Sequence, residues 1–286
     1  MKQLFLVLSC LSFFAGCKAS PGFSKPLPAV KIRDLAYGSF ASSKMDVYLP
    51  AGRTPATPFV IVIHGGAWVM GDKEWGTRTQ DSLLAHGIAS ANINYRYADD
   101  HTTHYAQLLA DIDSAIQFCV AHGSKWNTRK QKLVITGESA GAHLALLYAY
   151  ANPGKISAVI SACAPTDLTD TSLLKYYAKN DPSLLQSVYK ITGAAYEPGK
   201  TLPAAFAAAS PVYQVQPIPT LFFHGTGDWV VPYQQATALE KALKEKGVTY
   251  RFVPMKDQGH DLGFNSAEGR KVIYGEMMSW IIKYGK

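Results

Sequence analysis

The sequence predicts one α/β domain in which a mostly parallel sheet carries helices on both faces. Strand-like and helix-like segments alternate along most of the chain, as they do where helices connect parallel strands. Several strand-like runs are continuously apolar, such as FVIVIH at 59–64, which is typical of strands buried on both faces. The 286 residues are 48% apolar and 17% charged, enough for a sizeable core, and no repeat or linker divides them.

The elements follow in order from local patterns. Strands are predicted at 44–50, 59–64 and 88–95, with a helix over 77–87 that Gly87 closes. A helix over 105–123 that ends at Gly123 precedes a strand at 132–136 and a helix at 142–151. Strands at 156–165, 220–225 and 249–255 and helices at 232–243 and 268–284 complete the domain, which is assigned to 31–286. The alternation stops at about 167–210, and a small cap-like insertion of short helices and loops is predicted there, before the strand at 220–225.

The N-terminus predicts export. MKQLFLVLSCLSFFAGC has one Lys, an apolar stretch and then small residues, so 1–16 is interpreted as a signal peptide. Ala15, Gly16 and Cys17 resemble a bacterial lipobox, in which Cys17 is lipidated and holds the protein on a membrane; the alternative is a plain secretory signal cut nearby. The Pro- and Ser-containing segment 17–30 is predicted to be a flexible tether. We expect a protein of the bacterial cell envelope, periplasmic or at the cell surface, or a secreted one.

Charge, cysteines and missing motifs narrow the function classes. The net charge of +7 is scattered without a basic run, which argues against nucleic acid as a partner. Cys119 and Cys163 lie in apolar contexts and are predicted to be buried free thiols. The sequence lacks a G-x-G-x-x-G, a P-loop lysine, an H-E-x-x-H and a close cysteine pair, so neither a cofactor nor a catalytic metal is predicted. Nothing in the sequence predicts the oligomeric state.

The segment GESAG at 137–141 lies between the apolar run KLVIT and the helical run AHLALLYAYA. It fits G-x-S-x-G in the context that this motif requires, a strand before it and a helix after it. Small neighbours let the chain turn sharply while the serine hydroxyl projects from it. Ser139 is therefore predicted to be a nucleophile, against the simpler alternative of a tight turn.

A serine nucleophile needs a base and a carboxylate that orients the base. Ligands of parallel sheets bind beyond the carboxyl ends of the strands, and His260 lies in the loop KDQGHDLG after the last strand. Asp228 lies in the loop after the preceding strand, and the chain order Ser139, Asp228, His260 is that described for the strand–serine–helix turn. The alternatives are that Asp257 or Asp261 is the functional acid, or that Asp228 caps the helix at 232–243.

HGGAW at 64–68 follows the strand at 59–64, and its glycines allow backbone N–H groups to converge on an oxyanion. We predict an oxyanion hole from the N–H groups of Gly65, Gly66 and Ala140. Trp68 and Trp229, with tyrosines of the insertion, are predicted to line the substrate site; the alternative is that these rings form a core.

HGGAW, GESAG, HGTGDWVVP and the Gly259–His260 pair, in this order, resemble the α/β-hydrolase superfamily over nearly the whole chain. More narrowly they are similar to carboxylesterases with an HGGxW motif, namely the hormone-sensitive-lipase-like esterases, the BD-FAE group of acetylxylan and feruloyl esterases, and the kynurenine formamidases. The resemblance implies a serine hydrolase that acts through an acyl-enzyme on short acyl esters such as acetyl or feruloyl esters of carbohydrates. An amide hydrolase similar to the formamidases, which share Ala142, and a catalytically silent binding module are the alternatives.

Overall fold

The computed structural model describes residues 26–285. The predicted signal peptide, Cys17 and most of the predicted tether lie outside the described residues. No helix within 26–285 has the length and apolar character needed to span a bilayer.

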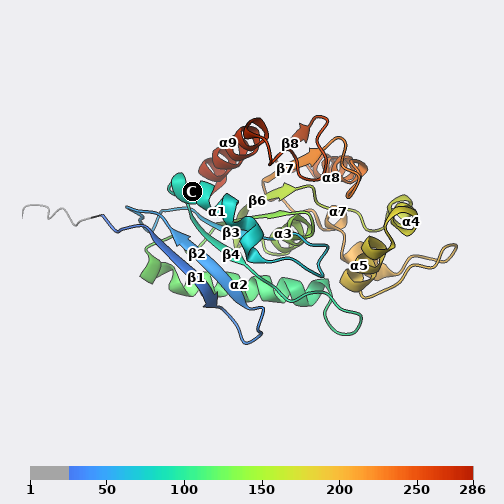
Figure 1. The fold of residues 1–286 in the computed structure, drawn as a ribbon, viewed down its shortest axis with the longest axis horizontal. Coiled ribbons are helices and arrows are strands. Elements are labelled where there is room, and N and C mark those ends of the chain that lie inside the picture. Colours follow the sequence, from blue (N-terminus) through green and yellow to red (C-terminus); the bar gives the residue numbers. More distant parts are fainter. Residues whose placement is uncertain (1–25, 286) are drawn as a thin grey trace, which may run out of the picture.

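Eight strands form one sheet in the order β1-β2-β4-β3-β5-β6-β7-β8, and only β1 and β2 run antiparallel to their neighbours (Figure 1). The carboxyl ends of the six strands from β4 to β8 in this order therefore meet at one edge of the sheet. The strands are β1 Val30–Ala36, β2 Lys44–Leu49, β3 Phe59–Ile63, β4 Ala89–Ile93, β5 Leu133–Glu138, β6 Ile156–Ala162, β7 Thr220–Gly225 and β8 Tyr250–Met255.

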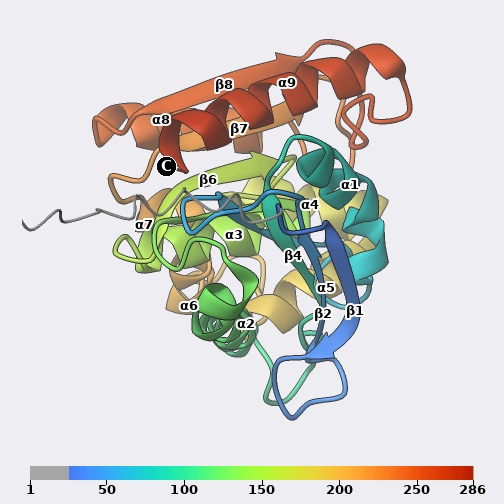
Figure 2. The same ribbon diagram turned by 90° about the vertical axis from the view of Figure 1, so that its left-hand side faces the viewer.

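Helices cover both faces of this sheet, as predicted (Figure 2). Alternate residues of β3 explain why its run is continuously apolar: Ile61 and Ile63 pack into one core, and Val60 and Val62 into the other. The first core includes side chains of α2, α3 and α8, and the second includes side chains of α1 and α9. The helices are α1 Thr77–Ala85, α2 Tyr105–Trp126, α3 Ala140–Ala151, α8 Gln234–Glu245 and α9 Ala267–Tyr284, with a 3₁₀ turn η1 at Lys73–Gly76.

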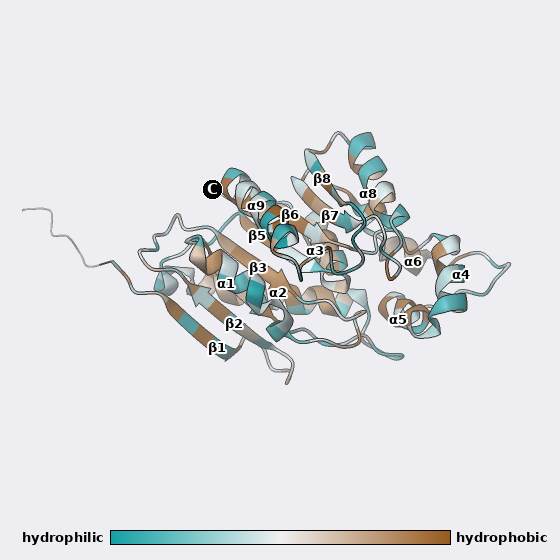
Figure 3. Ribbon diagram, turned by 45° about the horizontal axis from the view of Figure 1, so that its top comes forward, coloured by the Kyte–Doolittle hydropathy of each residue, from teal (hydrophilic) through white to brown (hydrophobic). Residues whose placement is uncertain are grey.

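The segment between β6 and β7 holds short helices, which lie at one end of the molecule (Figures 1 and 3). Asp170 and Asp181 accept hydrogen bonds from the first turns of α4 and α5, and their carboxylates thereby fix where these helices begin. Side chains such as Leu173, Val188 and Phe206 are fully or almost fully buried in the first core, so the segment is part of the packed domain. Its helices are α4 Thr171–Asn180, α5 Pro182–Thr192, α6 Ala204–Ala208 and α7 Pro211–Gln214.

One local expectation was wrong, and one strand was not predicted. Helix α2 passes through Gly123 and ends at Trp126, and the following Asn127, with a φ of 55°, forms the left-handed cap. A Cβ on Gly123 would meet the Lys130 side chain, so this glycine allows the returning chain to approach the helix. The strand that was not predicted is β1, an edge strand of mixed burial whose residues show no clear alternation of apolar and polar side chains.

Candidate active site

Ser139 lies at the sharp turn between β5 and α3. Its φ of 52° and ψ of −120° fall in a region that non-glycine residues rarely adopt. The turn is held by hydrogen bonds from the Ser139 N–H to the Ala162 carbonyl at 2.8 Å and from the His143 N–H to the Ser139 carbonyl at 3.0 Å. The hydroxyl is thereby displayed on a half-buried residue at the carboxyl edge of the sheet.

Glycines on both sides of the serine allow this turn to pack. A Cβ on Gly137 would lie 2.8 Å from the Ala142 nitrogen, and one on Gly141 would lie 2.8 Å from the His64 carbonyl carbon. Backbone atoms cannot move aside cheaply, so the turn has room for glycine alone at both positions. The motif therefore joins three strands and a helix into one tightly packed unit.

Asp228 lies in the loop after β7, as predicted. Its carboxylate is fully buried, and Oδ1 accepts hydrogen bonds from the Val230 and Val231 N–H groups, both at 2.9 Å. The N-cap of α8 is Tyr233, so Asp228 does not cap that helix. The hydroxyl of Tyr177 in α4 donates to the Val230 carbonyl at 2.9 Å, and so the segment between β6 and β7 holds the loop of the acid in place.

His260 and Asp228 form a hydrogen-bonded pair, with Nδ1 of the imidazole 2.7 Å from Oδ2 of the carboxylate. Burial lowers the pKa of His260, whereas nearby Cys163 and the Asp228 carboxylate raise it, and the net direction is upward. Because burial raises the pKa of the Cys163 thiol, this thiol is neutral at neutral pH, and we assign the stabilisation of the imidazolium to Asp228. The imidazole is 24% exposed and is open to a substrate.

His260 comes close to the serine turn from the other side. Cys163 follows Ala162, which accepts the hydrogen bond of the Ser139 N–H, and the Cys163 thiol donates to the His260 carbonyl at 3.3 Å. Burial raises the pKa of Glu138, the residue before Ser139, and the charge of His260 opposes this rise, which places His260 near the turn. Within 26–285 no hydrogen bond of the Ser139 hydroxyl is found, and such contacts are often loose without substrate.

Two of the three residues predicted to form the oxyanion hole, Gly65 and Ala140, lie at the same turn. A Cβ on Gly65 would lie 3.3 Å from the Ser139 Cβ, so the loop after β3 lies directly against the serine. Gly66 has a φ of 109°, which only glycine adopts without strain, and Ala140 is the first residue of α3. Among the hydrogen bonds of the described chain, the N–H groups of Gly65, Gly66 and Ala140 donate none, which leaves them free for an anionic oxygen.

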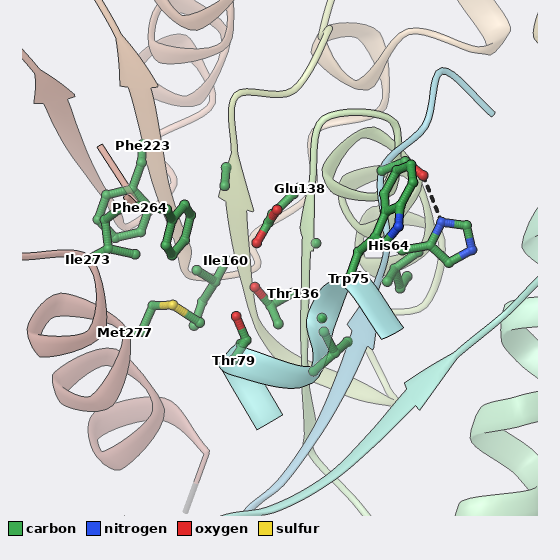
Figure 4. Close-up of a pocket in the computed structure, with 16 residues that line it drawn as sticks. His64, Trp75, Thr79, Thr136, Glu138, Ile160, Phe223, Phe264, Ile273 and Met277 are labelled. Atoms are coloured by element: carbon green, nitrogen blue, oxygen red, sulfur yellow. Dashed lines mark hydrogen bonds between the residues drawn. The ribbon is translucent and has the colours of Figure 1, made fainter. Parts of the chain in front are cut away.

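A narrow cavity lies behind the turn, on the face of α1 and α9 (Figure 4). Most of its walls are apolar side chains such as Ile160, Phe223 and Met277. The Glu138 side chain points toward this space, near Thr136 (Figure 4). Burial raises the pKa of Glu138, although the charges of His260 and Arg78 act in the opposite direction.

The two predicted aromatic walls differ in position. Trp229 is 68% exposed beside Asp228, as a residue that meets substrate would be. Trp68 is 4% exposed, and its indole N–H donates to Nδ1 of the buried His143 at 3.1 Å. This burial does not fit the substrate-lining role expected of Trp68. Its φ of 64° instead makes it part of the strained loop that positions Gly65 and Gly66.

Sequence reasoning expected Tyr177 among the aromatic walls of the substrate site, but it missed the contact of Tyr177 with the loop of Asp228 and missed Cys163 as a neighbour of the acid–base pair. Both cysteines of the domain are free and buried, as predicted, but only the position of Cys163 immediately after a parallel strand could have indicated its place at the site. Tyr177 lies in a segment whose packing no periodicity predicts.

Comparisons with known proteins agree with this architecture. The probable isoprenylcysteine alpha-carbonyl methylesterase ICMEL1 of Oryza sativa subsp. japonica is 26% identical over 85% of this chain and 60% of its own length. Esterase LipC of Mycobacterium tuberculosis is 27% identical over 80% of this chain and 60% of its own length, so the chain spans under two thirds of both relatives. A solved carbohydrate esterase from gut microbiota, in truncated form, superposes with a TM-score of 0.73 at 21% identity, over 90% of this chain and 98% of that one.

The structural likeness confirms the predicted α/β-hydrolase fold. The model of the BD-FAE family matches residues 45–243, more than half of the chain, and includes the serine turn, the glycine loop and Asp228. The protein therefore belongs to the BD-FAE family of the α/β-hydrolase superfamily.

Proposed function

We propose that the protein is a serine carboxylic-ester hydrolase with Ser139 as nucleophile, His260 as general base and Asp228 as the orienting acid. The observation that carries the proposal is the 2.7 Å hydrogen bond between His260 Nδ1 and Asp228 Oδ2, beside a serine held in a strained turn. The pairing leaves Nε2 of His260 free to accept the proton of the serine hydroxyl. Free N–H groups of Gly65, Gly66 and Ala140 next to the serine add the donors that acyl transfer requires.

The reaction has two steps. His260 takes the Ser139 proton as Oγ attacks the ester carbonyl, and the backbone donors stabilise the oxyanion that forms. The alcohol then leaves with the proton from His260, and an acyl-enzyme remains. Water repeats the sequence with His260 as base, and it releases the acid and restores the serine.

The substrates that we propose are short acyl esters, with acetyl or feruloyl esters of carbohydrates first among them. Two features support this class. Export predicted from 1–16 suits an extracellular polysaccharide, and a solved neighbour is a carbohydrate esterase. The exposed ring of Trp229 beside Asp228 offers a flat apolar surface on which a sugar or an aromatic acid can stack.

Hydrolysis of 4-nitrophenyl acetate, butyrate and octanoate, of acetylated xylan and of a feruloylated sugar by the purified protein tests the proposal. We expect turnover of the short esters, and loss of about a millionfold in kcat in Ser139→Ala, the scale typical of a removed triad nucleophile. Folding of the variant is checked by circular dichroism. A folded wild type that hydrolyses none of these esters refutes the esterase, and assays of formyl amides and of ligand binding then separate an amidase from a binding module.

We further propose that Cys17 is acylated and that the protein is held at the cell envelope. Mass spectrometry of the N-terminal peptide of the protein purified from its cells tests this. A diacylated or triacylated Cys17 supports it, and a free N-terminus elsewhere shows a secreted protein.

A further inference from the structure

Three side chains with metal-binding atoms meet beside the serine turn. Cys163 follows β6, Asp228 follows β7 and His260 follows β8, so three successive parallel strands bring them to one edge of the sheet. One ligand atom from each, a sulfur, a carboxylate oxygen and an imidazole nitrogen, lies within 4.8 Å of the other two. They are the one group of three such residues in the part of the chain that the structure describes.

We propose that Cys163, Asp228 and His260 form a binding site for a soft divalent cation such as Zn²⁺ or Cd²⁺, and that a cation bound there inhibits the enzyme. The inhibitory part rests on the proposed role of His260 as base.

The donor set fits such an ion in kind and in charge. Zn²⁺ prefers thiolate, imidazole and carboxylate ligands, and three protein ligands leave its fourth position open to water. A thiolate and a carboxylate together carry two negative charges, so the ion makes the buried cluster neutral. Burying the thiolate or the carboxylate in this cluster without a compensating positive charge would cost free energy.

The distances need only small adjustments. Ligands of a tetrahedral zinc at about 2.0 to 2.3 Å from the metal lie about 3.3 to 3.6 Å from one another. The Nδ1–Oδ2 distance must therefore open from 2.7 Å, while the two distances from the sulfur are at most 4.8 Å and so within about 1.5 Å of this spacing. Side-chain rotations supply shifts of this size without movement of the strands.

Protons account for the inhibition. In the resting pair the Nδ1–H of His260 donates a hydrogen bond to the Asp228 carboxylate, and Nε2 is free to act as base. A metal on Nδ1 takes the place of this proton, so the neutral imidazole carries its one proton on Nε2 and cannot accept the proton of Ser139. The Cys163 thiol releases its proton to solvent when its sulfur binds the metal.

Cys163→Ser and Cys119→Ser provide a matched pair of tests. Serine at 163 keeps a donor toward the His260 carbonyl, which the thiol contacts at 3.3 Å, but it removes the soft ligand. Cys119 is the other free buried thiol of the domain and lies 3.8 Å from the Met45 sulfur, away from the site. Ester turnover is measured for both variants and the wild type in increasing Zn²⁺ or Cd²⁺, with Mg²⁺ as the hard cation.

We expect Zn²⁺ and Cd²⁺ to inhibit the wild type and Cys119→Ser alike, and a chelator to restore turnover. The concentration for half inhibition should rise at least about tenfold in Cys163→Ser, since even partners that only support metal ligands change affinity by this much. Equal inhibition of Cys163→Ser, or relief of inhibition in Cys119→Ser, overturns the proposal.

Binding is also measured without activity. Co²⁺ or Cd²⁺ added to Ser139→Ala should produce thiolate-to-metal charge-transfer absorption, and the double variant with Cys163→Ser should not. If Ser139→Ala shows this charge-transfer absorption but the wild type hydrolyses no ester, the proposed function is refuted and the proposed metal site is still supported. Turnover without this absorption would refute the metal site alone.

Discussion

The glycine at 141 provides a direct test of how the serine turn is assembled. It is the second residue of α3, and a Cβ added there would lie 2.8 Å from the His64 carbonyl carbon and closer still to the carbonyl oxygens of Ile63 and His64. All three atoms are backbone. Clearing the carbon alone to the ordinary 3.4 Å requires the start of α3 to move about 0.6 Å away from β3, and clearing the two closer oxygens requires more.

This movement separates the serine from the donors at Gly65 and Gly66, which follow β3. A misplacement of about 1 Å at reacting groups can cost about a hundredfold in rate, so we expect kcat/KM of Gly141→Ala to fall about tenfold to a hundredfold. Overpacking costs about 1 to 3 kcal/mol, and the better helix propensity of alanine returns up to about 1 kcal/mol. The melting temperature should fall by a few degrees.

The matched control is Gly275→Ala in α9, a helical glycine with nothing within 4 Å of an added Cβ. It gains the same propensity without a clash, so its melting temperature should rise slightly and its turnover of 4-nitrophenyl acetate should not change. If Gly141→Ala keeps kcat/KM within twofold of the wild type and unfolds at the same temperature, the close approach of α3 to β3 does not govern the site.

The other predictions concern protonation and substrate contact. The imidazole of His260 should titrate above 6.5 in NMR spectra of Ser139→Ala, and Asp228→Asn should lower this pKa. The kcat/KM of the wild type should fall as pH drops through the pKa of His260. An imidazole that titrates below 6.5 contradicts our assignment. Burial raises the pKa of Glu138, so the native state binds the proton of this carboxyl more tightly than the unfolded state and loses stability as pH rises from the unfolded-state pKa to the native-state pKa. Glu138→Gln should therefore melt at a higher temperature than the wild type at neutral pH and at the same temperature near pH 4. Equal melting temperatures at neutral pH refute this explanation. If the exposed ring of Trp229 contacts the substrate as proposed, Trp229→Ala should raise KM for aromatic esters severalfold. Because this side chain is 68% exposed, the free energy of unfolding should stay within about 0.5 kcal/mol of the wild type. An unchanged KM removes Trp229 from the substrate site.

Sequence patterns predicted the sheet because burial on both faces leaves continuous apolar runs, and β3, β5 and β7 are buried throughout or nearly so. Ser139 was predicted from its G-x-S-x-G motif between a strand and a helix, and Asp228 and His260 from the rule that functional loops lie at the carboxyl ends of parallel strands. The structure places all three residues there and pairs the last two.

What the sequence could not predict depends on contacts between distant segments. The predicted helix end at Gly123 was wrong because a glycine can also occur inside a helix where another segment packs closely against it, here the side chain of Lys130. The burial of Trp68 depends on His143, which lies 75 residues later, and the position of Tyr177 on the loop of Asp228 depends on a segment without a clear period. No local pattern contains this information.

The order of the strands also has a consequence for heat inactivation. Ser139 follows β5, which is paired on both sides, whereas His260 follows β8, the edge strand that pairs with β7 alone. Edge elements open more readily than central ones, and amide hydrogen exchange resolves such partial openings. An opening at the β8 margin would carry the base away while the nucleophile stays in a native core. The enzyme would then lose turnover reversibly at temperatures where its central sheet is still protected, and its working range would be set by the least stable margin of the fold.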